Sequence, residues 1–164
     1  MLKIYLAKTE QDIDDTMKLF FEYMEYLKVY FQELENFTWL IEYYKDFEKE
    51  INSLPGKYRS PGRYIFLAKY DGHLAGCVGL QGENDGICEM QRLFIRANYR
   101  RKGIGIKLCE TVIEQAQKSG YTRLQLHTAI EPAKELYKSL GFTEIAPTEN
   151  IPLETVVFME LTLT

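Results

Sequence analysis

The first third of the chain has a helical pattern of apolar positions. One apolar stripe consists of Met17, Phe20, Phe21, Met24 and Leu27. Its members recur every three or four residues, which places them on one face of a helix. Thr9, followed by acidic residues, supplies the start of this helix. An aromatic-rich segment at 33–53 predicts a second helix, and Pro55 with Gly56 ends it.

From residue 63 onwards the pattern becomes that of strands. Apolar runs at 63–70 and 73–82 flank the dipeptide Asp71-Gly72. An Asp-Gly pair between two such runs is a strong hairpin signal. A polar turn at 83–86 leads into a further apolar strand at 87–95, and a short strand at 3–7 precedes the first helix.

The remainder of the chain alternates helices and strands. A helix begins near 103 and ends at Gly120, and its expected apolar face is Ile106, Cys109, Ile113 and Ala116. A strand at 123–128 follows. Pro132 then begins a short helix that Gly141 closes. The apolar face of that helix is Ala133, Leu136, Tyr137 and Leu140. Two last strands are expected near 142–146 and 155–163.

This succession, β-α-α-β-β-β-α-β-α-β-β, predicts an α/β fold with one mixed sheet. The unit 87–128 is expected to be parallel because a helix connects its strands, while the hairpins are antiparallel. Helices should therefore cover both faces of a mostly antiparallel sheet. With 164 residues the chain is long enough for one real core and short for two, so we expect a single domain over 1–164.

Composition narrows the classes of partner. A net charge of −4 and a pI near 5.3 argue against nucleic acid as the main partner. The three cysteines lack metal or redox spacing, and we expect reduced, buried thiols and no metal site. Neither a signal-peptide pattern nor an apolar run of 18 residues is present, so we expect a cytoplasmic protein without a membrane partner.

A short basic turn carries the strongest chemical signal. It consists of Arg100, Arg101, Lys102, Gly103, Ile104 and Gly105. The first amides of a helix lack internal partners, and glycines let an anion approach them. A P-loop would need Lys-Ser/Thr after its last glycine, where Ile106-Lys107 stands, and the dinucleotide fingerprint would need a third glycine at Leu108. The turn therefore predicts a phosphate or pyrophosphate site of another kind.

Several segments resemble the GNAT N-acetyltransferases. The coenzyme A pyrophosphate loop of that superfamily reads Gln/Arg-x-x-Gly-x-Gly/Ala, and Arg100, Gly103 and Gly105 fill its fixed positions. Residues 133–142 match the family's Ala-x-x-Leu-Tyr-x-x-x-Gly-Phe helix, and 85–95 match its central strand. The last strand and Leu54-Pro55-Gly56 resemble a bacterial branch. The resemblance is firm over 63–164 and loose before that.

The resemblance implies acetyl-CoA as cosubstrate. The backbone of Leu93, Phe94 and Ile95 would pair with the pantetheine arm, and the basic turn at 100–105 would hold the pyrophosphate. The thioester would lie where strands 87–95 and 123–128 splay apart. Two departures stand out: Ile130 occupies a position where the family often has Asn, and Arg101 replaces a common Gly.

Two side chains are candidates for catalysis. Tyr137 matches the family's general acid, since a phenol keeps its proton at neutral pH, although an aromatic on this face would also suit a core. Glu89 stands eleven residues before Arg100, the spacing of the catalytic Glu in the histone-acetylating branch. It is either a general base or a structural carboxylate paired with a basic neighbour. His127 is either structural or a substrate contact.

These features predict an acetyl-CoA-dependent N-acetyltransferase that acts directly on a primary amine of a small molecule or an exposed amino group. The alternatives are a non-catalytic acyl-CoA-binding or sensing domain and a nucleotide-binding domain. The acidic composition favours cationic acceptors, and an edge strand near the C-terminus offers a route to a homodimer. One aromatic set could line an acceptor pocket or simply pack in the core: Tyr23, Tyr26, Tyr30, Trp39 and Tyr43.

Overall fold

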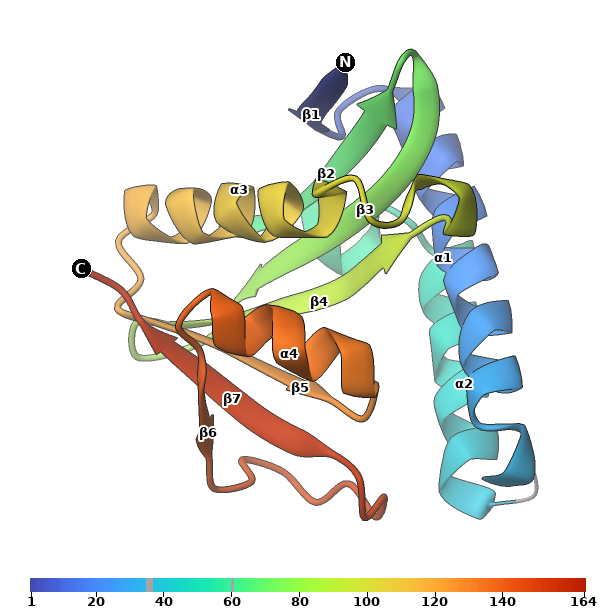
Figure 1. Ribbon diagram of the computed structural model, residues 1–164, viewed down its shortest axis with the longest axis vertical. Coiled ribbons are helices and arrows are strands. Elements are labelled where there is room, and N and C mark those ends of the chain that lie inside the picture. The colour runs from blue at the N-terminus through green and yellow to red at the C-terminus, as the bar shows by residue number, and fades with distance from the viewer. Residues whose placement is uncertain (35–36, 60) are drawn as a thin grey trace.

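The computed structural model describes residues 1–34, 37–59 and 61–164 (Figure 1). Its strands are β1 (Leu2–Leu6), β2 (Arg63–Tyr70), β3 (His73–Gly82), β4 (Ile87–Ile95), β5 (Arg123–Thr128), β6 (Thr143–Ile145) and β7 (Val157–Thr162). Its helices are α1 (Glu10–Tyr30), α2 (Thr38–Asn52), α3 (Ile104–Lys118) and α4 (Glu131–Ser139). Short 3-10 turns lie at Gln32–Leu34, Gly56–Arg59 and Ala97–Tyr99. The predicted succession of strands and helices is confirmed.

The described strands form one mixed sheet in the order β1-β2-β3-β4-β5-β7-β6. β4 and β5 are parallel, and the other neighbouring strands are antiparallel. Because α3 connects β4 to β5, the predicted parallel strand-helix-strand unit is confirmed. The mostly antiparallel character of the sheet is confirmed as well.

Helices cover both faces of this sheet, which gives the fold two apolar cores (Figure 1). Along β2, Ile65 and Leu67 join the core under α1 and α2, whereas Phe66 and Ala68 join the core under α3. Successive side chains of a strand point to opposite faces, so a continuous apolar run is buried on both sides.

Two local signals in the sequence correspond to observed hydrogen bonds and turns. The Thr9 side chain accepts from the Asp12 amide at 3.0 Å, and the Asp12 carboxylate accepts from the Thr9 amide at 3.0 Å. This reciprocal capping box begins α1. Asp71 and Gly72 both have positive φ, 49° and 82°, as the tight hairpin turn between β2 and β3 requires.

The predicted helix at 33–53 is wrong in its first turn. Helix α1 ends at Tyr30, a 3-10 turn follows at Gln32–Leu34, and α2 begins only at Thr38. Residues 35 and 36, which fall within the predicted helix, lie outside the described residues. α1 and α2 both bury an apolar face against the same side of the sheet. The chain must therefore reverse between them, and this requirement overrides an unbroken helical pattern.

Two predicted core positions are also wrong. Phe21 is 52% exposed and Ile106 is 42% exposed. Phe21 is rotated by about 100° from Phe20, which is fully buried. The face of α3 that meets the sheet is Ile104, Leu108, Cys109, Val112 and Ala116, and Ile106 lies nearly opposite its first member.

β4 and β5 separate after a short paired stretch. Only Ile87–Glu89 pair with Arg123–Gln125, and the strands then diverge (Figure 1). Beyond that point the register between β3 and β4 shifts, and Arg92 there has a φ of 59°. This shift is a β-bulge, which bends a strand and redirects its side chains. The predicted splay between 87–95 and 123–128 is confirmed.

Burial accounts for the state of the thiols. Cys77, Cys88 and Cys109 are free and buried, as the sequence predicts. Burial raises the pKa of Cys88 and of Cys109 to about 12, which keeps both thiols protonated.

Within the described part of the chain, none of the helices combines the length and the apolarity that a bilayer crossing demands.

Candidate active site

A cavity of roughly 480 Å³ occupies the space where β4 and β5 separate, and we call it the splay cavity. It lies between the second half of β4, the start of α3 and the start of α4. Eight of the nine predicted cofactor-binding residues line it: Leu93, Phe94, Ile95, Arg100, Arg101, Gly103, Ile104 and Gly105. The ninth, Lys102, does not, and its ammonium lies 5.1 Å from the centre of the Tyr70 ring.

The backbone at the start of α3 leaves open space in which a ligand can approach it closely. Gly103 is the N-cap, with a φ of 76°, and a Cβ built there would meet nothing within 4 Å. Arg101 also has a positive φ, 63°, at the position where the resemblance has glycine. Such a conformation is strained for a residue with a side chain. Arg100 donates through Nε to the Ile95 carbonyl at 3.0 Å, which fixes its guanidinium beside the cavity.

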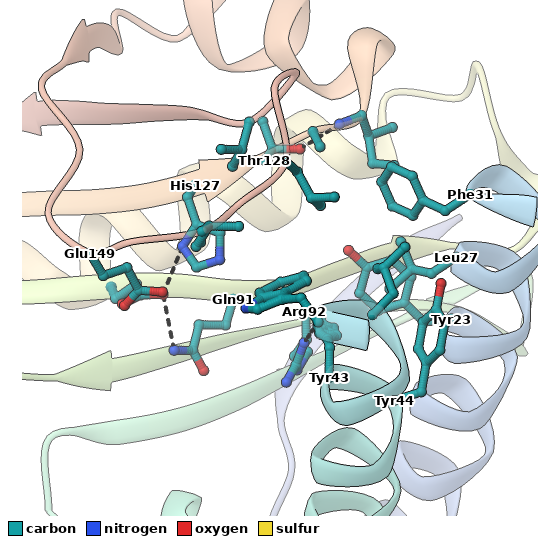
Figure 2. Close-up of a pocket in the computed structure, with 18 of the residues that line it drawn as sticks. Tyr23, Leu27, Phe31, Tyr43, Tyr44, Gln91, Arg92, His127, Thr128 and Glu149 are labelled. Atoms are coloured by element: carbon teal, nitrogen blue, oxygen red, sulfur yellow. Dashed lines mark hydrogen bonds and ion pairs between the residues drawn. The ribbon is translucent and has the colours of Figure 1, made fainter. Parts of the chain in front are cut away.

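A second cavity of roughly 280 Å³ lies toward α1 and α2, and we call it the helix-side cavity (Figure 2). Several residues line both cavities: Tyr23, Met90, Gln91, Arg92, His127, Thr128 and Ile130. The two cavities therefore meet at the point where β4 leaves β5. An arrangement of this kind can hold two reactants end to end.

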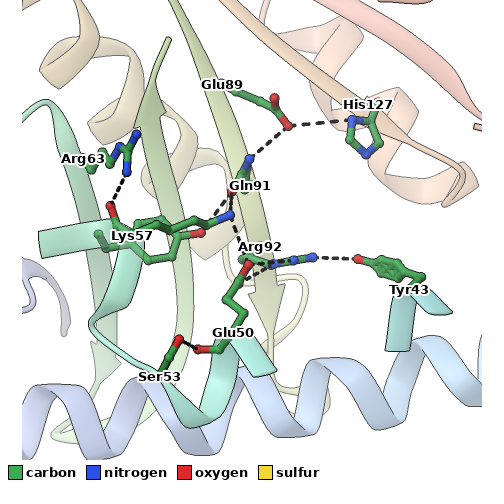
Figure 3. A network of polar contacts seen from close by, with 10 residues as sticks. Tyr43, Glu50, Ser53, Lys57, Arg63, Glu89, Gln91, Arg92 and His127 are labelled. Carbon is green, nitrogen blue, oxygen red and sulfur yellow. Dashed lines mark hydrogen bonds and ion pairs between the residues drawn. The ribbon is translucent and has the colours of Figure 1, made fainter. Parts of the chain in front are cut away.

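Glu89, the predicted base, lines the helix-side cavity and contacts Gln91 and His127, two of the residues that both cavities share (Figure 3). Its Oε1 accepts a hydrogen bond from Gln91 Nε2 at 3.1 Å and lies 3.7 Å from His127 Nδ1. Burial raises the pKa of Glu89 to about 7, and the carboxylates of Glu83 and Glu149 act in the same direction, while the Gln91 hydrogen bond opposes them. A carboxyl group that titrates near neutral pH is suited to general base work.

The orientation of the Gln91 amide follows from its partners. Its Oε1 accepts from Lys57 Nζ at 2.8 Å and from the Tyr58 hydroxyl at 3.1 Å. The Lys57 ammonium can only donate, so the oxygen of the amide must face it and the nitrogen must face Glu89. Gln91 therefore connects Glu89 to the partly buried cation Lys57.

Arg92 was not among the residues predicted from the sequence. Its guanidinium donates to both oxygens of Glu50, at 3.0 and 3.1 Å, and to the Tyr43 hydroxyl at 2.6 Å (Figure 3). It also lies 3.9 Å from the centre of the Phe47 ring. Burial would raise the pKa of Glu50, but the Arg92 guanidinium and the Lys57 ammonium together outweigh it and leave that pKa lowered. The pair is therefore ionised.

Tyr137, the predicted acid, lies on α4 and lines the splay cavity. Its ring packs 5.8 Å from that of Phe142, and 7% of its surface is exposed. Burial raises its pKa well above the ordinary value, so the phenol keeps its proton. Within the described residues its hydroxyl has no hydrogen-bond partner and is left free for a bound molecule.

The other candidate residues differ in whether they line the two cavities. Burial lowers the pKa of His127, which leaves its imidazole neutral at the junction of the cavities. The Ile130 side chain makes no hydrogen bond at the N-cap of α4 and lines both cavities, so it contributes only apolar contact.

The predicted aromatic set is divided. Tyr23, Trp39 and Tyr43 line the helix-side cavity, but Tyr26 and Tyr30 do not. Among the described residues, no group of three or more potential metal ligands gathers.

The amino-acid sequence is similar to those of known N-acetyltransferases. An uncharacterized N-acetyltransferase of Schizosaccharomyces pombe is 30% identical over 98% of this chain and 94% of its own length. An N-acetylaspartate synthetase of Xenopus tropicalis is 34% identical over 56% of this chain and 35% of its own length. Because these relatives are eukaryotic, the predicted bacterial branch is not confirmed.

Solved structures share the fold. The PaiA N-acetyltransferase of Thermoplasma acidophilum, solved in complex with coenzyme A, has a TM-score of 0.74 and 17% identity over 99% of both chains. A GNAT-family acetyltransferase of Staphylococcus aureus has a TM-score of 0.75 and 19% identity over the whole of both chains. The sequence model of the Acetyltransferase (GNAT) family matches residues 19–142. The chain therefore belongs to the GNAT family of acetyltransferases.

Proposed function

We propose that this protein transfers the acetyl group of acetyl-CoA directly to a primary amine. The observation that carries the proposal is the meeting of the two cavities at the divergence of β4 and β5. Tyr137 faces the splay cavity, and Glu89 faces the helix-side cavity. A thioester in the first and an amine in the second would place the reacting atoms between an acid and a base.

The splay cavity suits the shape of the coenzyme. Beyond Glu89 the edge of β4 that faces β5 has no partner among the described strands, so an extended pantetheine arm can pair with residues 93–95. The pyrophosphate then reaches the amides at the start of α3 and the guanidinium of Arg100. The complex of the Thermoplasma protein with coenzyme A supports this assignment.

The proposed chemistry balances one bond formed against one broken. The neutral amine attacks the thioester carbonyl carbon, a C–N bond forms, and the C–S bond breaks. Glu89 accepts the proton that the amine loses, and Tyr137 gives a proton to the departing thiolate. The products are an amide and free coenzyme A, and exchange with solvent restores both side chains.

Direct transfer also agrees with the state of the thiols. A covalent acyl-enzyme would need a thiolate in contact with the bound thioester. Cys77, Cys88 and Cys109 are buried, burial raises the pKa of each, and none of them lines either cavity. The two bound substrates are therefore expected to react with each other in one ternary complex.

The binding half of this proposal can be tested by calorimetry. We expect the protein to take up coenzyme A, and Arg100→Ala to weaken that binding about tenfold, because one charge-assisted contact to phosphate is lost. Pantetheine, which lacks the pyrophosphate, should bind both proteins equally. Equal loss of pantetheine binding in the variant would show that Arg100 supports the fold rather than the phosphates.

The catalytic half can be tested by thiol release. Purified protein with acetyl-CoA should release free coenzyme A at a steady rate when an amine is added, and the rate should saturate in both substrates. Initial-rate patterns should intersect, as expected for a ternary complex. Tight binding of coenzyme A with no release for any amine would instead support a non-catalytic acyl-CoA-binding domain.

The contact between Gln91 and Glu89 gives a separate prediction. In Gln91→Leu the hydrogen bond that holds down the pKa of Glu89 is removed, so this pKa should rise by about one unit above its value near 7. The acidic limb of the pH profile for kcat/KM should move upward by the same amount. Gln125→Leu is the matched control, since Gln125 bonds Glu160 on the neighbouring strand. An unmoved limb in Gln91→Leu would contradict this role.

A further inference from the structure

Aromatic side chains wall the helix-side cavity on the sides away from the reaction centre. Rings of Tyr23, Trp39, Tyr43 and Tyr44 come from α1 and α2. Trp39 and Tyr43 lie 5.4 Å apart, and their planes are inclined at 31°. Ile151 and Leu153, from the segment between β6 and β7, also line this cavity. Such walls stabilise the apolar body of a ligand by burial and by ring contact.

The helix-side cavity offers a carboxylate ligand no unpaired Lys or Arg side chain among the described residues that line it. Arg92 is the sole Lys or Arg among the described residues that line it. Its Nε and one terminal nitrogen are held by Glu50, and the other terminal nitrogen donates to Tyr43. A bidentate carboxylate contact would require this guanidinium to leave Glu50, whose buried carboxylate would then keep Lys57 Nζ, 3.1 Å away, as its one cationic partner among the described ion pairs.

The free charges in the cavity are negative. Glu89 lines the cavity from β4, and Glu149 lines it from the segment that precedes β7 (Figure 2). Neither carboxylate contacts a Lys or Arg side chain among the described ion pairs. These groups attract an ammonium group and repel a carboxylate that enters beside it.

We infer that the acceptor is a primary amine on a short chain that carries an uncharged apolar ring, and that it has no carboxylate next to the amine. This inference rests on the proposed function, because it assigns the helix-side cavity to the acceptor. The amine would reach Glu89, and the ring would lie among Trp39, Tyr43 and Tyr44. The arrangement excludes free α-amino acids, whose carboxylate would face Glu149 without a cationic partner.

The test compares three acceptors in the thiol-release assay: 2-phenylethylamine, phenylalanine and putrescine. Phenylalanine has the same ring and amine and adds only the carboxylate, so we expect its kcat/KM to be about 100-fold lower. Putrescine lacks the ring, and a value about tenfold lower is expected. Equal or higher values for phenylalanine or putrescine would overturn the inference.

Variants of two cavity residues test where the acceptor ring lies and which charge disfavours a carboxylate. Trp39→Ala should raise KM for 2-phenylethylamine about tenfold and leave the affinity for coenzyme A unchanged. Phe21→Ala is the matched control, because this aromatic of α1 is exposed and lines neither cavity. Glu149→Lys should narrow the gap between 2-phenylethylamine and phenylalanine about tenfold by supplying the missing cation. An unchanged gap, or an equal effect of Phe21→Ala, counts against the assignment.

Failure of this inference differs from failure of the proposed function. If the protein binds coenzyme A and releases thiol with amino acids or polyamines but not with 2-phenylethylamine, only the acceptor class is wrong. If it neither binds coenzyme A nor releases thiol with any amine, the proposed function fails and the acceptor class fails with it.

Discussion

Replacing Tyr137 with phenylalanine is expected to lower kcat for acetyl transfer about 100-fold while leaving the affinity for coenzyme A unchanged. A proton that arrives at the coenzyme A sulfur as the C–S bond breaks stabilises the departing thiolate. Tyr137 is the phenol of α4 that lines the splay cavity, and burial keeps it protonated. The measurement is steady-state thiol release, together with calorimetry of coenzyme A binding.

The stability of the variant separates chemistry from folding. The Tyr137 hydroxyl has no partner within the described residues, so its loss should change the melting temperature little. Tyr64→Phe is the matched control, because Tyr64 packs against the same core and lines neither the splay cavity nor the helix-side cavity. Full activity in Tyr137→Phe would remove this residue from the mechanism.

Glu89→Gln is expected to lower kcat/KM for the amine about 100-fold at pH 8, where the native carboxyl group is ionised. Glutamine keeps the size of the side chain but cannot accept the proton. Burial raises the pKa of Glu89 to about 7, so the base is present above that pH and lost below it. The rate of the native enzyme should therefore fall as the pH drops through 7.

The shape of the pH profile makes this prediction specific. Below pH 7 both the acceptor ammonium and Glu89 must lose a proton, so log kcat/KM should rise with a slope of about 2. Above pH 7 only the acceptor still titrates, and the slope should fall to about 1. In Glu89→Gln the slope should stay near 1 throughout. A break near pH 7 that survives in the variant would assign Glu89 a structural role.

The same pKa shift affects stability. The pKa of Glu89 is higher in the folded protein than in the unfolded chain, where it lies near 4.5. Between these two values the folded state binds more protons, so this group makes the protein less stable as the pH rises toward 7. Glu89→Gln removes that dependence, which gives a second readout that is independent of activity.

Much of the fold could be predicted from local pattern. The period of the apolar residues and the turn chemistry at Thr9 and Asp71-Gly72 act between close neighbours, so the sequence of elements follows from them. The basic turn at 100–105 could be recognised for the same reason, because its glycines and cations are contiguous. Its position beside the splay also followed, since α3 must begin where β4 ends.

Local pattern failed where distant elements compete for one surface. Phe21 and Ile106 suit a helix face by spacing, but the sheet accepts a face turned away from them. The break between α1 and α2 has the same origin. In these places the packing of whole elements, which no short window contains, decided the outcome.

The sequence by itself determined the order of strands and helices and the basic turn at 100–105, because each depends on residues that adjoin in the chain. Only the tertiary structure decided which charges meet beside the helix-side cavity. The bulge at Arg92 turns this cation onto Glu50, 42 positions earlier in the chain, and Gln91 joins Lys57 to Glu89. Charges so far apart in sequence can neutralise one another only once the sheet and α2 bring them together. That pairing leaves Glu89 and Glu149 as the free charges of the cavity.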